Sequence, residues 1–260
     1  MKFNSNFMGH NGKEELERIE NEVSPQKKNI TSKVNSPIIP ILGELSFVTD
    51  ENLYKEIVKY LDKTFTNKKD TFSNNLKFKD SVMKGSNTYI ATAVDMYLKS
   101  INSEYRLANQ LDLEQNLDFT KGTYNDSGLA LRNLVGYNKN QAAYLFEQIK
   151  KLGKTEKDFP IWFNLRGLNL DSNLNFNLTP ESFYKTSECL NWQSGTKFSK
   201  VNDFGLPKEM DENFRRQIWT SNGALSGCYL GGSSSLYSNG SVLSNSYVNG
   251  RVVLAKPRSG

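Results

Sequence analysis

The sequence predicts an α+β fold, with helices in its first part and short strands in its last part. Three segments carry apolar residues at the spacing of amphipathic helices, over about residues 51–63, 87–101 and 138–152. After Pro160 the apolar residues form short runs or alternate with polar residues, and Gly and Asn separate these runs. That pattern is typical of short strands joined by turns.

Each end of the helical region carries a local signal. Asp50 can cap the first helix, and Gly153 can end the third because glycine readily adopts a left-handed backbone. The polar segment 64–85 predicts a long loop or hairpin. The faces expected to be buried are Leu53, Ile57, Tyr60 and Leu61 in the first helix, Ile90, Val94, Leu98 and Ile101 in the second, and Ala142, Leu145, Phe146, Ile149 and Leu152 in the third.

The strand signals differ in strength. Residues 161–165 are almost all apolar and predict a strand with Trp162 in the core. Residues 174–178 alternate with period two, as a half-buried strand does. Weaker strand signals occur around Trp192, residues 218–219 and residues 252–254.

The composition divides the chain into three parts. Residues 1–35 are rich in Asn, Lys and Glu, which predicts a polar, flexible arm. Residues 36–85 predict an N-terminal extension with one helix, and residues 86–260 form the main domain. We find no secretory signal and no run of about 20 apolar residues, so we expect a chain that is soluble when synthesised.

Several kinds of function have no support in the sequence. The net charge of +5 comes mainly from Lys residues spread along the chain, so we expect no nucleic-acid binding. His10 is the only histidine, and with Cys189 and Cys228 it makes neither a catalytic relay nor a zinc site. Residues 169–173 are more typical of a turn than of a calcium loop. We therefore expect no cofactor, no metal, no membrane insertion and no catalytic residue.

The most unusual segment is residues 221–250. It contains no Lys, Arg, Asp or Glu, although 23% of the chain is charged, and Ser, Gly, Asn and Tyr occupy 22 of its 30 positions. Tyr offers a large contact area, while Ser, Gly and Asn offer adaptable hydrogen bonds. Apolar anchors recur through the segment at Leu225, Leu230, Leu236 and Leu243. The segment therefore predicts a binding surface held by leucines, and favours a binding protein over an enzyme.

A longer pattern surrounds this segment. Trp219 precedes it, and Gly250, Arg251 and the apolar residues 252–254 follow it. Over about residues 219–255 this pattern resembles the variable proteins of diversity-generating retroelements, of the archaeal and viral type. In that family a reverse transcriptase copies a template with errors at adenines, and the altered copy replaces the 3′ end of the gene.

The family displays its variable residues on a C-type lectin fold. The resemblance therefore implies a C-type lectin-like domain for residues 86–260, with short antiparallel strands, two or three helices and a variable region at about 221–250. A weaker likeness extends to residues 124–129 and to the helix at 87–101. The carbohydrate-binding motifs of true C-type lectins, Glu-Pro-Asn and Gln-Pro-Asp, are absent, so carbohydrate binding is not implied.

The residue types in the run agree with diversification at adenines. Changes at the two adenines of AAC or AAT codons cannot produce Lys, Glu, Gln, Met or Trp. These five types make up 56 of the 260 residues, so roughly six are expected in the run at random. Residues 221–250 contain none of them.

The resemblance separates scaffold positions from variable ones. It implies that the scaffold positions are Leu225, Ser226, Leu230, Leu236, Ser238, Leu243, Ser246, Gly250 and Arg251. It implies that the variable, ligand-facing positions are Gly227, Cys228, Tyr229, Gly231, Gly232, Ser233, Ser235, Tyr237, Asn239, Gly240, Ser241, Asn245, Tyr247 and Asn249.

Physical reasoning adds roles to some of these positions. Arg251 can hold several loop carbonyls with its guanidinium. Tyr229, Tyr237 and Tyr247 are expected to be the energetic anchors of binding. Trp219 either packs under the variable surface or helps to shape it.

The sequence thus predicts a ligand-binding display protein, in a virion or at a cell surface, whose target is a protein or a cell-surface component. Its N-terminal region is expected to dock the protein to virion components. Two alternatives stay open. One is an enzyme relative of the formylglycine-generating enzymes, which share this fold and would need a paired-cysteine or copper site, for which Cys189 and Cys228 are the available thiols. The other is a purely structural virion protein.

Overall fold

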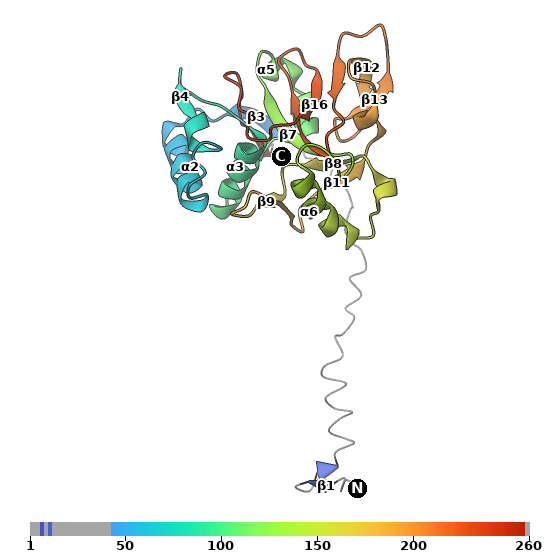
Figure 1. The fold of residues 1–260 in the computed structure, drawn as a ribbon. Coiled ribbons are helices and arrows are strands. Elements are labelled where there is room, and N and C mark those ends of the chain that lie inside the picture. The colour runs from blue at the N-terminus through green and yellow to red at the C-terminus, as the bar shows by residue number, and fades with distance from the viewer. Residues whose placement is uncertain (1–5, 8–9, 12–42, 258–260) are drawn as a thin grey trace. The chain divides into compact units, whose positions relative to one another are not determined.

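The computed structural model describes residues 6–7, 10–11 and 43–257 (Figure 1). The chain divides into two compact units, residues 1–36 and residues 37–260. Among the described residues, no helix is long and apolar enough to cross a membrane.

In the first unit, the described residues form a short pair of strands. β1 (Asn6–Phe7) pairs antiparallel with β2 (His10–Asn11), and Phe7 lies opposite His10. The flexible arm predicted for residues 1–35 otherwise lies outside the described residues.

The second unit confirms the α+β class. Its described residues contain five α-helices and an eight-stranded, curled, mixed sheet. The helices are α2 (Glu51–Thr64), α3 (Thr88–Ser100), α4 (Gln110–Glu114), α5 (Leu117–Thr120) and α6 (Lys139–Lys150). Helices α2 and α3 lie side by side (Figure 1), and the buried faces of both enter one hydrophobic core.

The three predicted helices are α2, α3 and α6, and their ends follow local rules. The Asp50 carboxylate accepts hydrogen bonds from the first-turn amides of α2, and Gly153 has the expected positive φ, of 86°. The predicted burial of Ile101 and Leu152 is wrong, because α3 and α6 end before them and each side chain is 49% exposed.

The main sheet has the strand order β11-β8-β7-β15-β16-β14-β12-β13. All neighbours pair antiparallel except β14 and β16, which are parallel. The strands are β7 (Asn125–Leu131), β8 (Ile161–Asn164), β11 (Tyr184–Thr186), β12 (Thr196–Val201), β13 (Pro207–Met210), β14 (Gln217–Thr220), β15 (Leu225–Leu230) and β16 (Leu236–Gly240).

Three smaller sheets complete the unit. β17 (Val253–Pro257) lies between β3 (Gly43–Phe47) and β6 (Arg106–Leu107), so the last strand joins the first part of the unit. β9 (Leu168–Leu170) pairs with β10 (Phe176–Leu178). A hairpin of β4 (Lys77–Lys79) and β5 (Val82–Lys84) lies in the segment predicted as a loop or hairpin.

Two strand predictions need correction. The strand predicted over 174–178 is confirmed only from Phe176 onward, because Leu174 has a positive φ of 64°, which no strand residue adopts. Trp192 is not in a strand. It follows the 3₁₀ turn Glu188–Asn191 and closes that turn, because its backbone amide donates to the Cys189 carbonyl.

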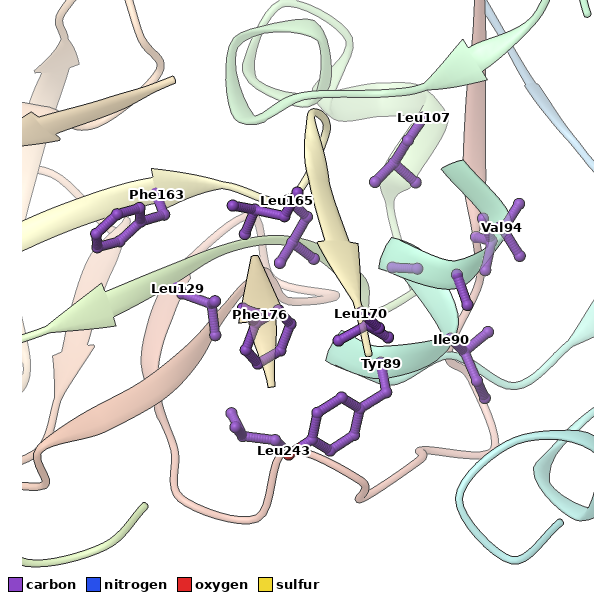
Figure 2. Packing of buried hydrophobic residues seen from close by; sticks show 14 of the residues in the cluster. Tyr89, Ile90, Val94, Leu107, Leu129, Phe163, Leu165, Leu170, Phe176 and Leu243 are labelled. Atoms are coloured by element: carbon purple, nitrogen blue, oxygen red, sulfur yellow. The ribbon is translucent and has the colours of Figure 1, made fainter. Parts of the chain in front are cut away.

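Each face of the main sheet has its own core, because successive strand residues point to opposite faces. Leu129 and Phe163 belong to the larger core, where Figure 2 shows them with Phe176 and with side chains from α3. Trp162 belongs to the second core and is 2% exposed, which confirms it as a core residue. Its indole lies against Gly128, where a Cβ would be only 2.1 Å from Nε1.

Candidate functional site

The run 221–250 forms part of the main sheet rather than a winding loop on its surface. It supplies β15, which lies between β7 and β16 at the centre of the sheet, then β16, and then a loop that leads to β17. The predicted burial of the leucines is confirmed: Leu225, Leu230 and Leu236 are fully buried, and Leu243 is 3% exposed. Figure 2 shows Leu243 in the larger core near Tyr89.

Arg132 connects the strands of this region through the hydrogen bonds of its guanidinium. It is buried at the end of β7, and its Nε donates to the Leu190 carbonyl at 2.8 Å. Its Nη1 donates to Ser226 Oγ at 2.6 Å, and its Nη2 donates to both the carbonyl (2.7 Å) and the hydroxyl of Ser238. One guanidinium thus joins β7, β15, β16 and the turn before Trp192. No local pattern around Arg132 distinguishes it from an ordinary surface arginine.

The loop after β16 is fastened by residues outside the run. Asn138 Nδ2 donates to the carbonyls of Leu225 and Ser241, both at 2.8 Å. Asn87 Nδ2 donates to the Ser244 carbonyl at 3.0 Å, and the Ser86 amide donates to Ser246 Oγ at 3.1 Å.

The predicted role of Arg251 is confirmed in its geometry. Its Nη1 donates to the carbonyls of Val248 (3.2 Å) and Gly250 (2.6 Å), and the side chain is half-buried. Gly250 itself lies against Ser86, where a Cβ would be 2.8 Å from the amide nitrogen. The loop therefore closes on the start of α3 through contacts that a larger residue at 250 would break.

Four tyrosines meet beside this loop, and we call Tyr124, Tyr229, Tyr237 and Tyr247 the tyrosine cluster. The rings of Tyr229 and Tyr237 are parallel within 2°, with centroids 5.0 Å apart. Tyr124 stacks on Tyr247 at 4.8 Å, and the hydroxyls of Tyr229 and Tyr247 are 3.3 Å apart. Trp219 extends the cluster, since its ring is 6.2 Å from that of Tyr237 at 17°. Trp219 is half-buried and so borders this surface.

The pairing register explains why these rings meet. Trp219 on β14 lies opposite Tyr237 on β16, and Tyr237 lies opposite Tyr229 on β15. Directly opposed residues of neighbouring strands project from the same face of a sheet. Tyr229 in turn lies opposite Asp126 on β7, so one row across four strands contains three aromatic rings and a carboxylate.

Asp126 is half-buried at the end of this row. Its carboxylate accepts hydrogen bonds from Ser86 Oγ at 2.6 Å and from Thr88 Oγ1 at 3.4 Å, both at the start of α3. Burial raises its pKa to about 6, and the two hydroxyls offset part of that effect. Burial, the Tyr247 hydroxyl and the Asp126 charge all raise the pKa of Tyr229, which stays protonated. Asp126 was not among the site residues that the sequence predicts.

The structure distributes the predicted variable positions over three environments. The exposed ones are Ser233, Asn245, Tyr247 and Asn249. The half-buried ones are Gly232, Tyr237, Asn239, Gly240 and Ser241. The buried ones are Gly227, Cys228, Tyr229, Gly231 and Ser235.

The outward position expected for the buried residues needs correction, because β15 is covered on both faces. Cys228 is fully buried in the second core with Trp162 and Cys189. A Cβ at Gly227 would be 2.6 Å from Thr88 Oγ1, and one at Gly231 would be 2.3 Å from the Tyr237 ring. Tyr229 is 8% exposed, so it is the buried member of the tyrosine cluster, and its ring lies against that of Tyr237.

The buried position of Ser235 has a similar cause. It lies where the turn after β15 re-enters the sheet, and its Oγ accepts a hydrogen bond from the Gln217 amide at 3.3 Å. Its hydroxyl therefore completes the pairing of β14 with β16 rather than facing a ligand.

The two thiols are not prepared for chemistry. Cys189 and Cys228 are both free and buried, and burial raises their pKa to about 11 and about 12. A nucleophilic cysteine needs a lowered pKa and access to its substrate. Within the described ranges, no group of three or more His, Cys, Asp and Glu residues could hold a metal ion.

Comparison of the chain with known family models, with curated proteins and with solved structures found no match in any of the three.

Proposed function

We propose that this protein is a ligand-binding display protein, in which the exposed and half-buried positions of residues 232–249, beside the tyrosine cluster, present exchangeable side chains on a fixed backbone. The proposed scaffold is C-type lectin-like, which is a finer assignment than the observed α+β class. The proposed source of variation is a diversity-generating retroelement acting on the 3′ end of the gene, and the proposed setting is a virion or a cell surface.

One observation carries the proposal: the groups that fasten the run lie outside it. Groups of Arg132, Asn138, Asn87 and Ser86 bind carbonyls and scaffold hydroxyls of the run, and exchange of the outer side chains leaves these bonds in place. Among residues 43–257, the side chains of Asn239, Asn245 and Asn249 form no hydrogen bond with the protein. Exchange at such positions costs the fold little, because surface substitutions of this kind change stability by about 0.5 kcal/mol or less.

The composition of the outer positions supports binding. Tyr237 and Tyr247 supply ring surface, and Tyr247 is 40% exposed. Tyrosine is enriched where protein partners are bound, because its large ring loses little conformational entropy. Serine and asparagine around the rings add hydrogen-bonding groups of several lengths.

The two alternatives have less support. A thiol-dependent enzyme needs an accessible thiolate, and both thiols are buried with raised pKa values. A structural protein with a loose serine-rich tail would not need that tail in its core, whereas β15 lies between two partner strands.

The test is a pair of libraries displayed on yeast. One library randomises six outer positions of the site: Ser233, Tyr237, Asn239, Asn245, Tyr247 and Asn249. The matched control randomises six exposed positions of α6: Lys139, Asn140, Ala143, Tyr144, Glu147 and Lys150. Each library is sorted for protease resistance and then for binding to a panel of purified proteins.

We expect most members of the site library to stay folded, and binders to arise from it at least about tenfold more often than from the α6 library. Loss of protease resistance in the site library, or an equal yield of binders, would overturn the proposal. Sequencing of the DNA around the gene tests the retroelement directly. It should contain a near-repeat of the 3′ end that differs only at adenines, beside a reverse transcriptase gene.

A further inference from the structure

The row Asp126, Tyr229, Tyr237 and Trp219 combines aromatic rings with a carboxylate that has no charged partner. Within the described part of the chain, Asp126 forms no ion pair, and its hydrogen-bond donors are the neutral hydroxyls of Ser86 and Thr88. The other carboxylates buried in this half of the molecule are compensated: Glu114 binds Arg216 at 2.7 Å, and Asp112 binds Arg106. Asp126 is therefore exceptional among them.

We propose that the tyrosine cluster and Asp126 form a subsite for a cationic side chain of the partner, namely the guanidinium of an arginine. This inference rests on the proposed binding function and specifies the chemistry of the ligand. Aromatic rings attract cations through the negative charge on their faces, and a half-buried carboxylate gains most from a cation that approaches through a dehydrated environment.

The layout of the row suits a planar cation better than a compact one. Trp219 and Tyr237 are nearly parallel, and Tyr247 is the most exposed ring of the cluster. A guanidinium can lie flat against such a ring and direct its N–H groups to a carboxylate, whereas an ammonium offers only a point charge. The phenolic oxygens of Tyr229 and Tyr247, 3.3 Å apart, add hydrogen-bond acceptors, and Tyr229 is close enough to Asp126 for the carboxylate charge to raise its pKa.

The position of Asp126 makes this subsite independent of variation in the run. Asp126 lies on β7, about 100 residues before the run, and its orientation is set by α3 through Ser86 and Thr88. Exchange at Tyr237 or Tyr247 would therefore tune the aromatic part of the subsite, while the charge would stay in place. Variants of the run would share a preference for basic partners and differ in the shape that they accept.

The test compares two probes of the same shape by NMR titration of the whole protein. N-acetyl-arginine amide carries a guanidinium, and N-acetyl-citrulline amide replaces it with a neutral urea. We expect the arginine probe to shift the signals of Tyr237 and Tyr247 and to bind about tenfold more tightly than the citrulline probe. Asp126→Asn, which keeps an oxygen for the Ser86 hydroxyl, should remove that difference.

Two further variants provide a second test and a control. Tyr237→Leu should weaken arginine binding several-fold even if Asp126→Asn fails to fold, while Tyr137→Leu, at an exposed tyrosine outside the cluster, should not change it. Equal binding of the two probes, no binding of either, or unchanged affinity in Asp126→Asn or Tyr237→Leu would overturn the inference. If the site library yields binders while arginine does not bind, the subsite is wrong and the display function stands. If arginine binds but the site library yields no binders, the subsite stands and the display function is wrong.

Discussion

Arg132 and Ser238 are 106 residues apart in the chain, yet the guanidinium of one binds both the carbonyl and the hydroxyl of the other. The same guanidinium reaches Ser226 on β15. The run 221–250 is therefore held by a charged group that lies outside it in the sequence. This relationship gives the most direct test of how the backbone of the run is held.

Replacing Arg132 with methionine should lower the free energy of unfolding by about 3 kcal/mol or more. The change removes four buried hydrogen bonds and leaves the Leu190 carbonyl without its Arg132 donor, while Ser226 Oγ and the Ser238 carbonyl keep only their bond to each other. Each buried group that loses a partner costs about 1–3 kcal/mol. Urea denaturation followed by circular dichroism measures the loss. The control is Arg215→Met at an exposed arginine, which should change stability by about 0.5 kcal/mol or less. Similar small effects in both variants would show that Arg132 does not fasten the sheet.

Neighbouring residues of β16 should respond in opposite ways to substitution. Leu236→Asp should destabilise the protein by several kcal/mol, because it places a carboxylate in the fully buried second core. Tyr237→Ala removes a half-buried ring from the other face and should cost about 1 kcal/mol. Thermal melts of the two variants, with Tyr144→Ala as an exposed control, measure the difference. Equal, large losses at both positions would contradict the assignment of anchor and display residues.

The thiols should resist alkylation while the protein is folded. Cys189 and Cys228 are buried, and their raised pKa values of about 11 and about 12 leave almost no thiolate at pH 8. We expect iodoacetamide to modify neither thiol in the native protein over minutes, and both in guanidinium chloride, as measured by mass spectrometry. Rapid labelling of Cys228 in the native state would contradict its buried position and would revive the thiol-enzyme alternative.

The pH dependence of stability should report the carboxyl group of Asp126. Its pKa is about 6 in the folded protein and 3.8 when unperturbed, so the folded state binds the proton more tightly. A raised carboxyl pKa means that stability from this group is present at low pH and is lost as pH rises through about 6. Relative to Asp126→Asn, the wild type should gain about 2 kcal/mol between pH 7 and pH 4, and the rest of the effect appears only below the unperturbed pKa of 3.8.

The comparison with Asp126→Asn is needed because other carboxyls also change the stability of the protein as pH falls. Hydrogen bonds lower the pKa of Asp171 and Asp158, and stability from these groups is lost as pH falls. Both proteins share those contributions, so they cancel in the difference between the two urea-denaturation curves. A difference that does not vary with pH would mean that Asp126 titrates as it does in an unfolded chain.

Local signals in the sequence predicted the parts of the fold that local chemistry determines. The Asp50 cap, the left-handed Gly153 and the apolar faces of three helices depend on residues a few positions apart. The leucines of the run were also predicted to be buried. Their strand was missed, because β15 is a strand only through its partners: Leu225 lies opposite Leu131, far away in the chain.

The candidate site shows the same limit. The tyrosines of the run were predicted as binding residues from their type and setting. Asp126 comes to lie beside these tyrosines through the register of β7 against β15, and Tyr124 joins the cluster next to a bridge between Tyr124 and Gly250. No spacing within the sequence encodes that register. The outward position expected for Cys228 failed for the same reason, since strand alternation turns it toward the second core.

The buried glycines of the run should therefore tolerate substitution less well than its outer asparagines, although both residue types are common in the run. Gly227→Tyr should destabilise the protein strongly, because a Cβ there is already 2.6 Å from Thr88 Oγ1 and a ring has no room beneath β15. Asn239→Tyr, at a half-buried position whose side chain forms no hydrogen bond within residues 43–257, should be nearly neutral.

Saturation libraries at Gly227, Gly231, Asn239 and Asn249, sorted for protease resistance, measure this directly. We expect large residues to be depleted at least about tenfold at the two glycines relative to the two asparagines, a difference of about 1.4 kcal/mol or more. Equal tolerance at all four positions would mean that β15 is not packed against α3, and the fixed backbone on which display depends would then have no basis.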